Sequence, residues 1–138
     1  MLFDQYNLPK DIFEVIFATE QQVKVGRLLF DELKNHGGEM GKTEMSVFAN
    51  KLHEGTIIEI EEQRGPVKRK VKTKMSYNKR QFYDRILTPM KGMGLITYDL
   101  YKKKYRISDG FTKAMQKIGV MWNQEVNKKV IAHNHSAP

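Results

Sequence analysis

The spacing of apolar residues switches from a helical to an alternating period and back, and this switch limits the folds open to the chain more than any other feature. Before Gly55, apolar residues recur three and four positions apart, as on one face of a helix. Residues 67–75 instead alternate between lysine and other side chains, as in a strand. Because the turn signal Arg64-Gly65-Pro66 precedes them, residues 56–75 are predicted to form a β-hairpin between helices. The pattern predicts a mostly helical α+β fold.

Helix signals divide the first part of the chain. Residues 8–18 are predicted to form a short helix, and Thr19 then begins a capping box. The helix that follows is predicted to end at the His-Gly-Gly sequence of residues 36–38. A kink at Thr19 and one long continuous helix both remain open. Another helix is predicted from Thr43, as its N-cap, to a stop at Gly55.

The segment after the hairpin is predicted to return to helix, then hairpin, then helix. Ser76 is the expected N-cap of a helix with a polar outer face. Pro89 either kinks this helix or forces it to end at Leu87 and restart. A second hairpin is predicted for residues 96–107, with Ile96, Tyr98 and Leu100 in its first strand and Lys102-Lys103-Lys104 at its tip. We expect a single domain, residues 1–138, made of N-terminal helices in 8–36, a core with both hairpins in 43–107, and a C-terminal amphipathic helix in 108–131.

Positive charge is concentrated in the second half of the chain. Residues 1–62 carry 6 Lys/Arg and 12 Asp/Glu, whereas residues 63–138 carry 18 Lys/Arg and 4 Asp/Glu. Like charges repel one another in a compact fold, so such a concentration predicts an external polyanion. Nucleic acid is the commonest polyanion that proteins bind. A solvated, flexible basic loop is the alternative interpretation.

The composition and motifs argue against several other classes of function. The chain has no cysteine, which excludes disulfides, thiolate zinc sites and cysteine nucleophiles. Its 4 histidines lack metal-ligand spacing, and no phosphate-binding glycine loop, nucleophile elbow or HExxH motif occurs. We therefore expect no enzyme activity, no cofactor and no metal. The apolar runs are too short to span a bilayer and no secretory leader is visible, so a cytoplasmic protein without membrane contact is expected.

The order of predicted elements resembles the winged helix-turn-helix superfamily, and within it the MarR/PadR-like transcriptional regulators. The resemblance is carried by Leu87 and Met90, followed by Met93-Gly94-Leu95-Ile96, then by Tyr98 to Ile107 and by Ser108-Asp109-Gly110-Phe111. These residues look like that group's recognition helix, its basic β-hairpin wing and the entry to a C-terminal helix. The hairpin between Gly55 and Ser76 departs from the usual order. Either it is an insertion, or the preceding helix lies elsewhere.

The resemblance implies that the helix after Ser76 reads DNA in the major groove. Its outward face carries amide and guanidinium groups that pair with base edges. The predicted base-reading residues are Tyr77, Asn78, Arg80, Gln81 and Arg85. The predicted DNA backbone-binding residues are Arg64, Lys68, Lys70, Lys72, Lys74, Lys79, Thr88, Lys102, Lys103, Lys104 and Arg106. The alternatives are an ordinary solvated helix face, and lysines that protect an edge strand from pairing.

The last helix carries an apolar stripe at near-heptad spacing. Its members are Phe111, Met115, Ile118, Trp122, Val126 and Val130. The resemblance implies that this stripe forms a two-fold homodimer, to which residues 8–18 could also contribute. A core helix packed within one chain is the alternative.

Together these observations predict a small homodimeric transcriptional regulator that binds double-stranded DNA sequence-specifically, in the cytoplasm and associated with the nucleoid. A sequence-tolerant nucleic-acid binder is a second hypothesis, and this class includes chromatin-like proteins, replication initiators and RNA binders. A protein-interaction adaptor with an acidic partner is a third.

Overall fold

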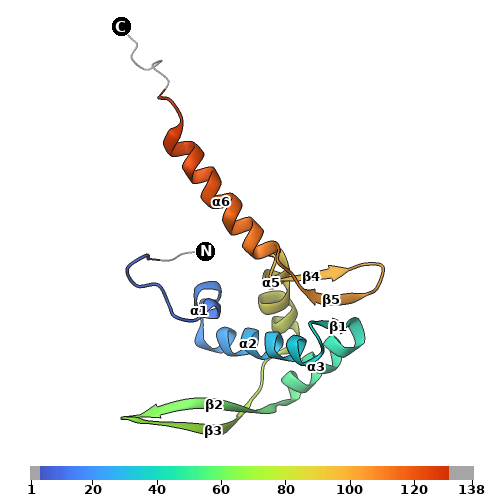
Figure 1. Ribbon diagram of the computed structural model, residues 1–138. Coiled ribbons are helices and arrows are strands. Elements are labelled where there is room, and N and C mark those ends of the chain that lie inside the picture. Colours follow the sequence, from blue (N-terminus) through green and yellow to red (C-terminus); the bar gives the residue numbers. More distant parts are fainter. Residues whose placement is uncertain (1–3, 131–138) are drawn as a thin grey trace.

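The computed structural model describes residues 4–130, apart from the side chains of Ile60 and residues 62–64. Seven helical segments, one of them a π-helical turn, and five strands follow one another along the part described (Figure 1). In order, these are α1 (Ile12–Ile16), α2 (Glu20–Asn35), β1 (Glu39–Gly41), α3 (Lys42–Glu54), β2 (Thr56–Arg64), β3 (Val67–Met75), α4 (Lys79–Gln81), a π-helical turn η1 (Phe82–Leu87), α5 (Thr88–Gly92), β4 (Ile96–Asp99), β5 (Lys104–Ile107) and α6 (Gly110–Asn127). The α+β class predicted from the sequence is confirmed.

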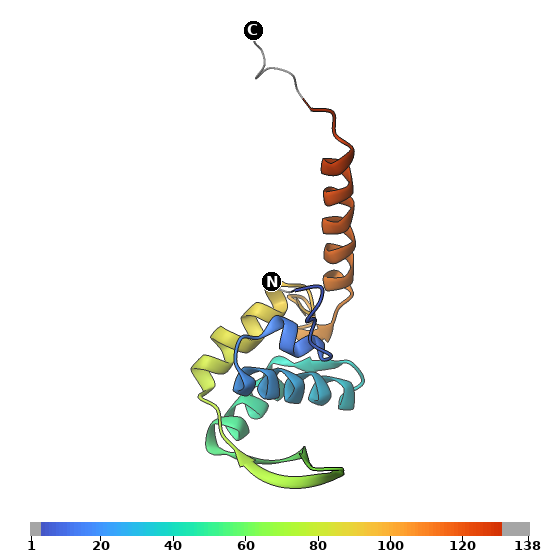
Figure 2. The same ribbon diagram turned by 90° about the vertical axis from the view of Figure 1, so that its left-hand side faces the viewer.

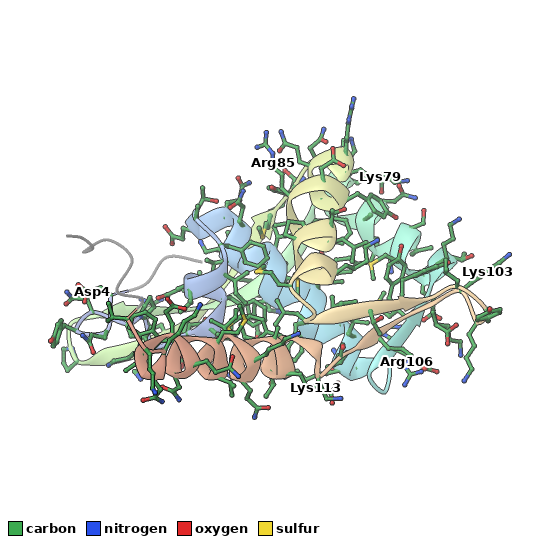
Figure 3. All side chains as sticks on the ribbon, turned by 90° about the horizontal axis from the view of Figure 1, so that it is seen from above. Asp4, Lys79, Arg85, Lys103, Arg106 and Lys113 are labelled. Atoms are coloured by element: carbon green, nitrogen blue, oxygen red, sulfur yellow. The ribbon has the colours of Figure 1, made fainter. Side chains whose placement is uncertain are left out.

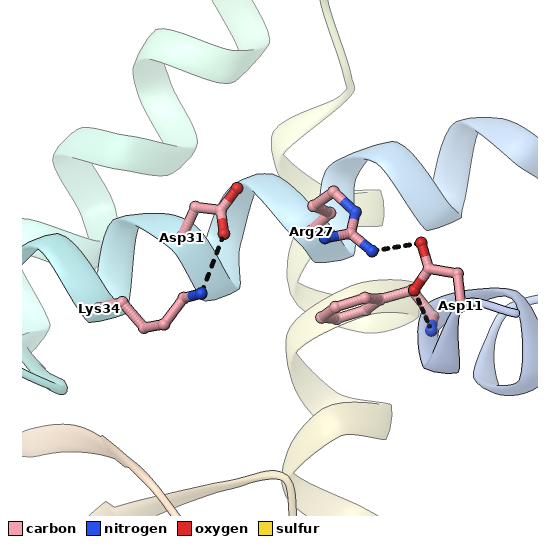
Figure 4. Close-up of polar contacts among 5 residues, drawn as sticks. Asp11, Arg27, Asp31 and Lys34 are labelled. Atoms are coloured by element: carbon pink, nitrogen blue, oxygen red, sulfur yellow. Dashed lines mark hydrogen bonds and ion pairs between the residues drawn. The ribbon is translucent and has the colours of Figure 1, made fainter. Parts of the chain in front are cut away.

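The chain forms two separate helices around Thr19 rather than one long helix. The backbone is extended at Phe17 and at Thr19, and the Thr19 hydroxyl accepts the Gln22 N–H as the first bond of α2. Asp11 caps α1 by accepting the Phe13 N–H and also pairs with Arg27 of α2, which ties the two helices together (Figure 4). This cap and this pair explain why α1 is stable although it has only five residues.

Strand β1 was not predicted from the sequence, and it completes a three-stranded antiparallel sheet of order β1-β5-β4. Its central residue, Met40, is buried and lies opposite Tyr105 of β5. Tyr105 in turn lies opposite Tyr98 of β4, with the ring centroids 4.6 Å apart. A three-residue strand has too few positions to show an alternating pattern, so only the pairing with β5 identifies it.

The predicted hairpin between the second and third major helices is confirmed. Strands β2 and β3 pair along their whole length, from Thr56 opposite Met75 to Arg64 opposite Val67. The hairpin attaches to the body at its base, where Ile58 and Met75 are buried, and the rest projects away (Figures 1 and 2). The helix before it is also where the sequence placed it, although Gly41 and not Thr43 is its N-cap.

The third major helix consists of α4, η1 and α5, and is called helix 79–92 below. Its N-cap is Asn78, whose side chain accepts the Gln81 N–H, and not Ser76 as predicted. The helix does not end at Leu87, because Leu87 and Thr88 both keep helical backbone angles. Instead the Thr88 N–H bonds to the Tyr83 carbonyl in a widened π-type turn. A widened turn leaves room for the proline ring that follows, which would otherwise press on the preceding turn of helix.

The apolar side chains of α2, α3, helix 79–92 and the sheet form one core. Phe82 lies within it, fully buried, with its ring 5.6 Å from that of Phe48 and 5.4 Å from that of Tyr83. The Phe17 ring covers Gly26 of α2 so closely that a Cβ there would lie 2.4 Å from it. None of the helices in residues 4–130 is both long and apolar enough to cross a membrane.

Helix α6 leaves the body and extends away from it, and none of its side chains is fully buried (Figures 1 and 2). Its first turn is fixed by the Phe111 N–H, which donates to the Gly94 carbonyl over 2.9 Å. The helix ends at Asn127, so it is shorter than the predicted 108–131 and Val130 lies beyond it. Ser108 is not the N-cap residue but supports the start, because its hydroxyl accepts the Gly110 N–H.

Candidate nucleic-acid interface

Two hydrogen bonds fix the start of helix 79–92 to the end of α3. The Tyr77 N–H donates to the Leu52 carbonyl over 2.9 Å, and the Lys79 N–H donates to Nδ1 of His53 over 3.0 Å. The second bond requires a lone pair on Nδ1, so the hydrogen of the neutral His53 ring lies on Nε2. These bonds set the angle between the two helices, and the sequence analysis did not identify His53 as a contributor.

Tyr77 was predicted to contact DNA, and the structure shows that this is wrong. Its side chain is only 5% exposed and belongs to the core. The prediction assumed that the helix began at Ser76, which would have turned Tyr77 outward. Because the helix begins after Asn78, Tyr77 lies in the extended segment before it and points into the protein.

The other predicted base-reading residues lie at the surface of helix 79–92. Gln81 and Arg85 are exposed, and the Arg80 side chain is 91% exposed, with its Nε 3.8 Å from Asp84. Asn78 is also exposed, but its amide oxygen is occupied by the cap, which leaves the NH₂ group to donate. These groups can therefore reach a ligand without any change in the fold.

The π-type turn alters which of these side chains share a face. In an α-helix, residues five apart point in clearly different directions, whereas in a π-helix they come close to alignment. The turn from Phe82 to Leu87 thus brings Arg85 nearer to the direction of Arg80 than the predicted regular helix would. Lys79 and Arg85 are both seen at one edge of the molecule, where this helix begins (Figure 3). Thr88 is exposed further along the same helix.

The loop that joins β4 to β5, residues 100–103, is a tight turn held by several hydrogen bonds. Asp99 Oδ1 accepts the N–H groups of Tyr101 (2.9 Å) and Lys102 (3.1 Å). Lys103 has φ +53°, and its carbonyl accepts the Lys42 N–H over 3.1 Å. The loop is therefore anchored both to its own strand and to the start of α3.

The predicted backbone-binding residues near this loop differ in their freedom. Lys102 and Lys103 are exposed on the loop itself. Lys104 lies in β5 and its Nζ is 3.1 Å from Glu39 Oε1, so it joins β5 to β1. Arg106 is exposed but lies directly opposite Glu39 in the strand pairing. The free positive charge at this end is therefore greatest on the loop.

Two carboxylates near the loop have lowered pKa values. The backbone hydrogen bond from Lys102 lowers the pKa of Asp99 below its ordinary value. The side-chain hydrogen bond from Lys104, and the charge on that group, lower the pKa of Glu39. A carboxyl whose pKa is lower in the folded state stabilises that state above its ordinary pKa near 4, and this contribution is lost as the pH falls through the lowered value.

We expect the Asp99→Ala variant to loosen the loop, because the acceptor for two backbone N–H groups is removed. Hydrogen exchange of the Tyr101 and Lys102 amides, followed by NMR, should then be several-fold faster than in the wild type. The Asp99→Asn variant is the matched control, since its amide oxygen can still accept both bonds. As the pH falls through the lowered pKa of Asp99, the protection factors of these two amides should fall in the wild type and not in Asp99→Asn. Equal exchange in all three proteins would contradict this role of Asp99.

The lysine-rich strand β3 lies apart from the surface that helix 79–92 and the β4–β5 loop form. The hairpin and Lys103 point to opposite sides of the molecule (Figures 1 and 3). Lys70 and Lys72 also lie directly opposite Glu61 and Glu59, which reduces the net positive charge of that face. Lys68 and Lys74 are exposed opposite Gln63 and Ile57, and the side chain of Arg64 is not among those described. The structure thus separates the predicted backbone-binding residues into two groups.

An acidic groove lies on another part of the body. It has a volume of ≈ 600 Å³ between α2, α3 and β2, with apolar side chains such as Phe48 and Val47 in its lining. Its carboxylates belong to Asp31, Glu32, Glu44 and Glu59. Negative charge repels phosphates, so this groove is not part of a nucleic-acid surface. No cluster of three or more metal-ligating side chains occurs among the described residues.

The apolar stripe of α6 is open to solvent. Ile118, Trp122 and Val126 are each more than half exposed, while Phe111 and Met115 near the base are partly buried. This contradicts the alternative of a core helix packed within one chain. Leu8 and Ile12, from the predicted N-terminal contribution to the dimer, are also exposed.

Two exposed apolar residues on the β4–β5 loop were missed by the sequence analysis. Leu100 was assigned to the strand and Tyr101 received no role, because the turn was expected to begin at Lys102. The Asp99 side chain starts the turn three residues earlier and turns both residues outward. Aspartate side chains often accept backbone N–H groups of the residues that follow them in turns, and Asp99 could have identified this loop by that preference.

Comparisons of the chain with protein-family models, with curated proteins and with solved structures found no match.

Proposed function

We propose that this protein is a homodimeric winged-helix regulator that binds double-stranded DNA sequence-specifically and acts on transcription in the cytoplasm, on the nucleoid. The observation that carries the proposal is the exposed row of Arg80, Gln81 and Arg85 on helix 79–92, together with the basic β4–β5 loop on the adjoining sheet. The element order supports it. Helix α2, helix α3, helix 79–92 and the β4–β5 hairpin follow one another in the order that the resemblance implies, with the β2–β3 hairpin as an addition between α3 and helix 79–92.

In this proposal helix 79–92 enters the major groove. A bidentate guanidinium recognises the O6 and N7 atoms of guanine, so Arg80 and Arg85 are its guanine readers. Gln81 has the amide geometry that pairs with adenine. The bond between His53 and Lys79 and the buried Tyr77 hold the helix at a fixed angle, and a fixed angle is required for base pairs to be told apart.

Lys102 and Lys103 bind phosphates beside the helix in the same proposal. Contacts of this kind set affinity and its salt dependence, and carry little sequence information. The hairpin lysines contribute only where a bound duplex curves back toward the opposite side of the protein, because the hairpin points away from the β4–β5 loop.

The proposed dimer forms through α6. An 18-residue helix with no fully buried side chain has little to stabilise it in water, and burial of its apolar stripe against a partner would stabilise it. A second copy supplies a stripe of the same shape and spacing, as a two-fold interface requires. Two reading helices in one dimer would then contact half-sites about one DNA turn apart, roughly 34–36 Å.

The proposal is tested by selecting bound duplexes from a random library and then titrating the enriched duplex by fluorescence anisotropy over a series of salt concentrations. We expect affinity that falls steeply with salt and a clear preference over random DNA. Equal affinity for random DNA would instead indicate a sequence-tolerant binder. Absence of duplex binding at low salt would contradict the proposal, and binding to an acidic protein would then favour the adaptor hypothesis.

The Arg85→Ala variant should lose specificity rather than general affinity. We expect a loss of about 1–3 kcal/mol on the selected duplex and little change on random DNA, because a base-reading contact is removed. Lys117→Ala, which removes an exposed charge from α6, is the control and should bind both duplexes as the wild type does. An equal loss on both duplexes for Arg85→Ala would assign Arg85 to the phosphates instead.

A further inference from the structure

Two large apolar side chains stand next to each other at the tip of the β4–β5 loop. Leu100 is 78% exposed and Tyr101 is 99% exposed. Single exposed apolar residues are common on protein surfaces and need no explanation. An adjacent leucine and tyrosine at the tip of a projecting hairpin form a continuous apolar point, and burying it in a partner would be favourable.

The loop presents these side chains rigidly. The Asp99 carboxylate holds the N–H of Tyr101 itself, and the Lys103 carbonyl is bonded to the start of α3. The ion pair between Lys104 and Glu39 fixes the strand that leaves the loop. A preorganised loop loses little conformational freedom on binding, which suits its apolar tip to insertion into a partner.

The charge around the apolar point indicates what kind of partner it meets. Lys102 and Lys103 follow directly and are exposed, whereas the neighbouring carboxylate of Asp99 faces its own backbone. The tip of the loop is therefore apolar at Leu100 and Tyr101 and cationic in the two residues that follow. That combination matches a DNA minor groove, where phosphates line the edges and stacked base steps form the floor.

We propose that Leu100 and Tyr101 act as a wedge that enters the minor groove, partly unstacks one base step and bends the duplex. The inference rests on the proposed function, since it requires that the protein binds duplex DNA. Wedges of apolar side chains bend DNA by roughly 20–90° toward the major groove. Unstacking costs least at flexible pyrimidine–purine steps, so the wedge favours a TA or CA step beside the sequence read by helix 79–92.

The experiment uses an A·T-rich duplex in which 2-aminopurine replaces the adenine of each TA step. Binding is measured by anisotropy, unstacking by the rise in 2-aminopurine fluorescence, and bending by energy transfer between dyes at the two ends. We expect the wild type to raise the fluorescence and bring the ends closer. The variant with Leu100→Ala and Tyr101→Ala should lose both signals and bind about tenfold more weakly.

Two control variants separate the wedge from other effects. Tyr101→Phe keeps the apolar ring and should retain both signals. Lys102→Gln should reduce the salt dependence of binding, by about one in the logarithmic slope, and leave the unstacking signal in place. Because all these positions are exposed, the circular dichroism and melting temperature should match the wild type in every variant.

The possible outcomes distinguish the wedge from the proposed function. If the wild type binds the duplex with neither unstacking nor bending, or if the double alanine variant keeps both signals, the wedge is refuted while DNA binding stands. If the wild type binds no duplex at low salt, the proposed function and the wedge are both refuted. Retention of DNA binding by the double variant, with loss of binding to vesicles of anionic lipid or to another protein, would assign the loop to that partner and also refute the wedge.

Discussion

The Ile118→Asp variant is expected to be monomeric and to lose tight binding to a two-fold-symmetric DNA site. Ile118 lies in the middle of the α6 stripe, so in the proposed dimer its replacement buries a carboxylate without a partner. An uncompensated buried charge costs about 3–5 kcal/mol, which is enough to dissociate a dimer of moderate affinity. Sedimentation equilibrium measures the change in mass, and anisotropy on the selected duplex measures the loss of binding.

Val120→Asp is a closely matched control for this variant. Val120 is 54% exposed and Ile118 is 53% exposed in the single chain, so the two substitutions start from nearly equal exposure to solvent. They lie two residues apart, about 200° around the helix axis, so Val120 is on the face opposite the stripe. We expect Val120→Asp to remain dimeric. A dimer that survives Ile118→Asp, or a dimer that both variants disrupt equally, would contradict an interface through the stripe.

The Gly94→Ala variant is expected to destabilise the fold by about 3 kcal/mol or more, the second large effect. Gly94 has φ +83°, a left-handed conformation that disfavours any Cβ by about 1–2 kcal/mol. A Cβ there would also lie 2.7 Å from the backbone of Gly110 and of Phe111, where α6 begins. Backbone cannot rotate away as a side chain can, so helix 79–92 and α6 must separate. Urea denaturation followed by circular dichroism measures the free energy of unfolding.

Gly92→Ala is the control for the glycine substitution, two positions earlier in the chain. A Cβ on Gly92 meets nothing within 4 Å, and the residue is helical. Alanine is favoured over glycine in a helix by about 0.5–1 kcal/mol, so this variant should be slightly more stable than the wild type. Similar losses in both variants would mean that the close approach of α6 to Gly94 is not what stabilises this junction.

Local signals in the sequence predicted the elements whose own residues specify them. The β2–β3 hairpin was predicted from the strict alternation of residues 67–75 and from the turn signal Arg64-Gly65-Pro66, and the structure places Gly65 and Pro66 between the paired residues Arg64 and Val67. Thr19, Gly37 and Gly55 likewise mark helix ends, because caps and positive φ angles act within a few residues. The exposed Arg80, Gln81 and Arg85 were also predicted correctly as surface residues.

Other features depend on segments far apart in the chain and were not predictable in this way. Strand β1 exists only because β5, about sixty-five residues later, pairs with it. The burial of Tyr77 depends on where helix 79–92 begins, which Leu52 and His53 of α3 determine through hydrogen bonds. The exposure of Leu100 and Tyr101 depends on the Asp99 turn and on the bond from Lys42 to Lys103.

The sequence by itself determined the major helices, the two hairpins and their order, and the concentration of positive charge in the second half of this protein. The tertiary structure alone decided that the basic hairpin and the β4–β5 loop point in opposite directions, and that α6 stands free of the body. The physical reason is that periodicity reports which face of an element is apolar or charged, whereas direction and burial depend on contacts with residues distant in sequence.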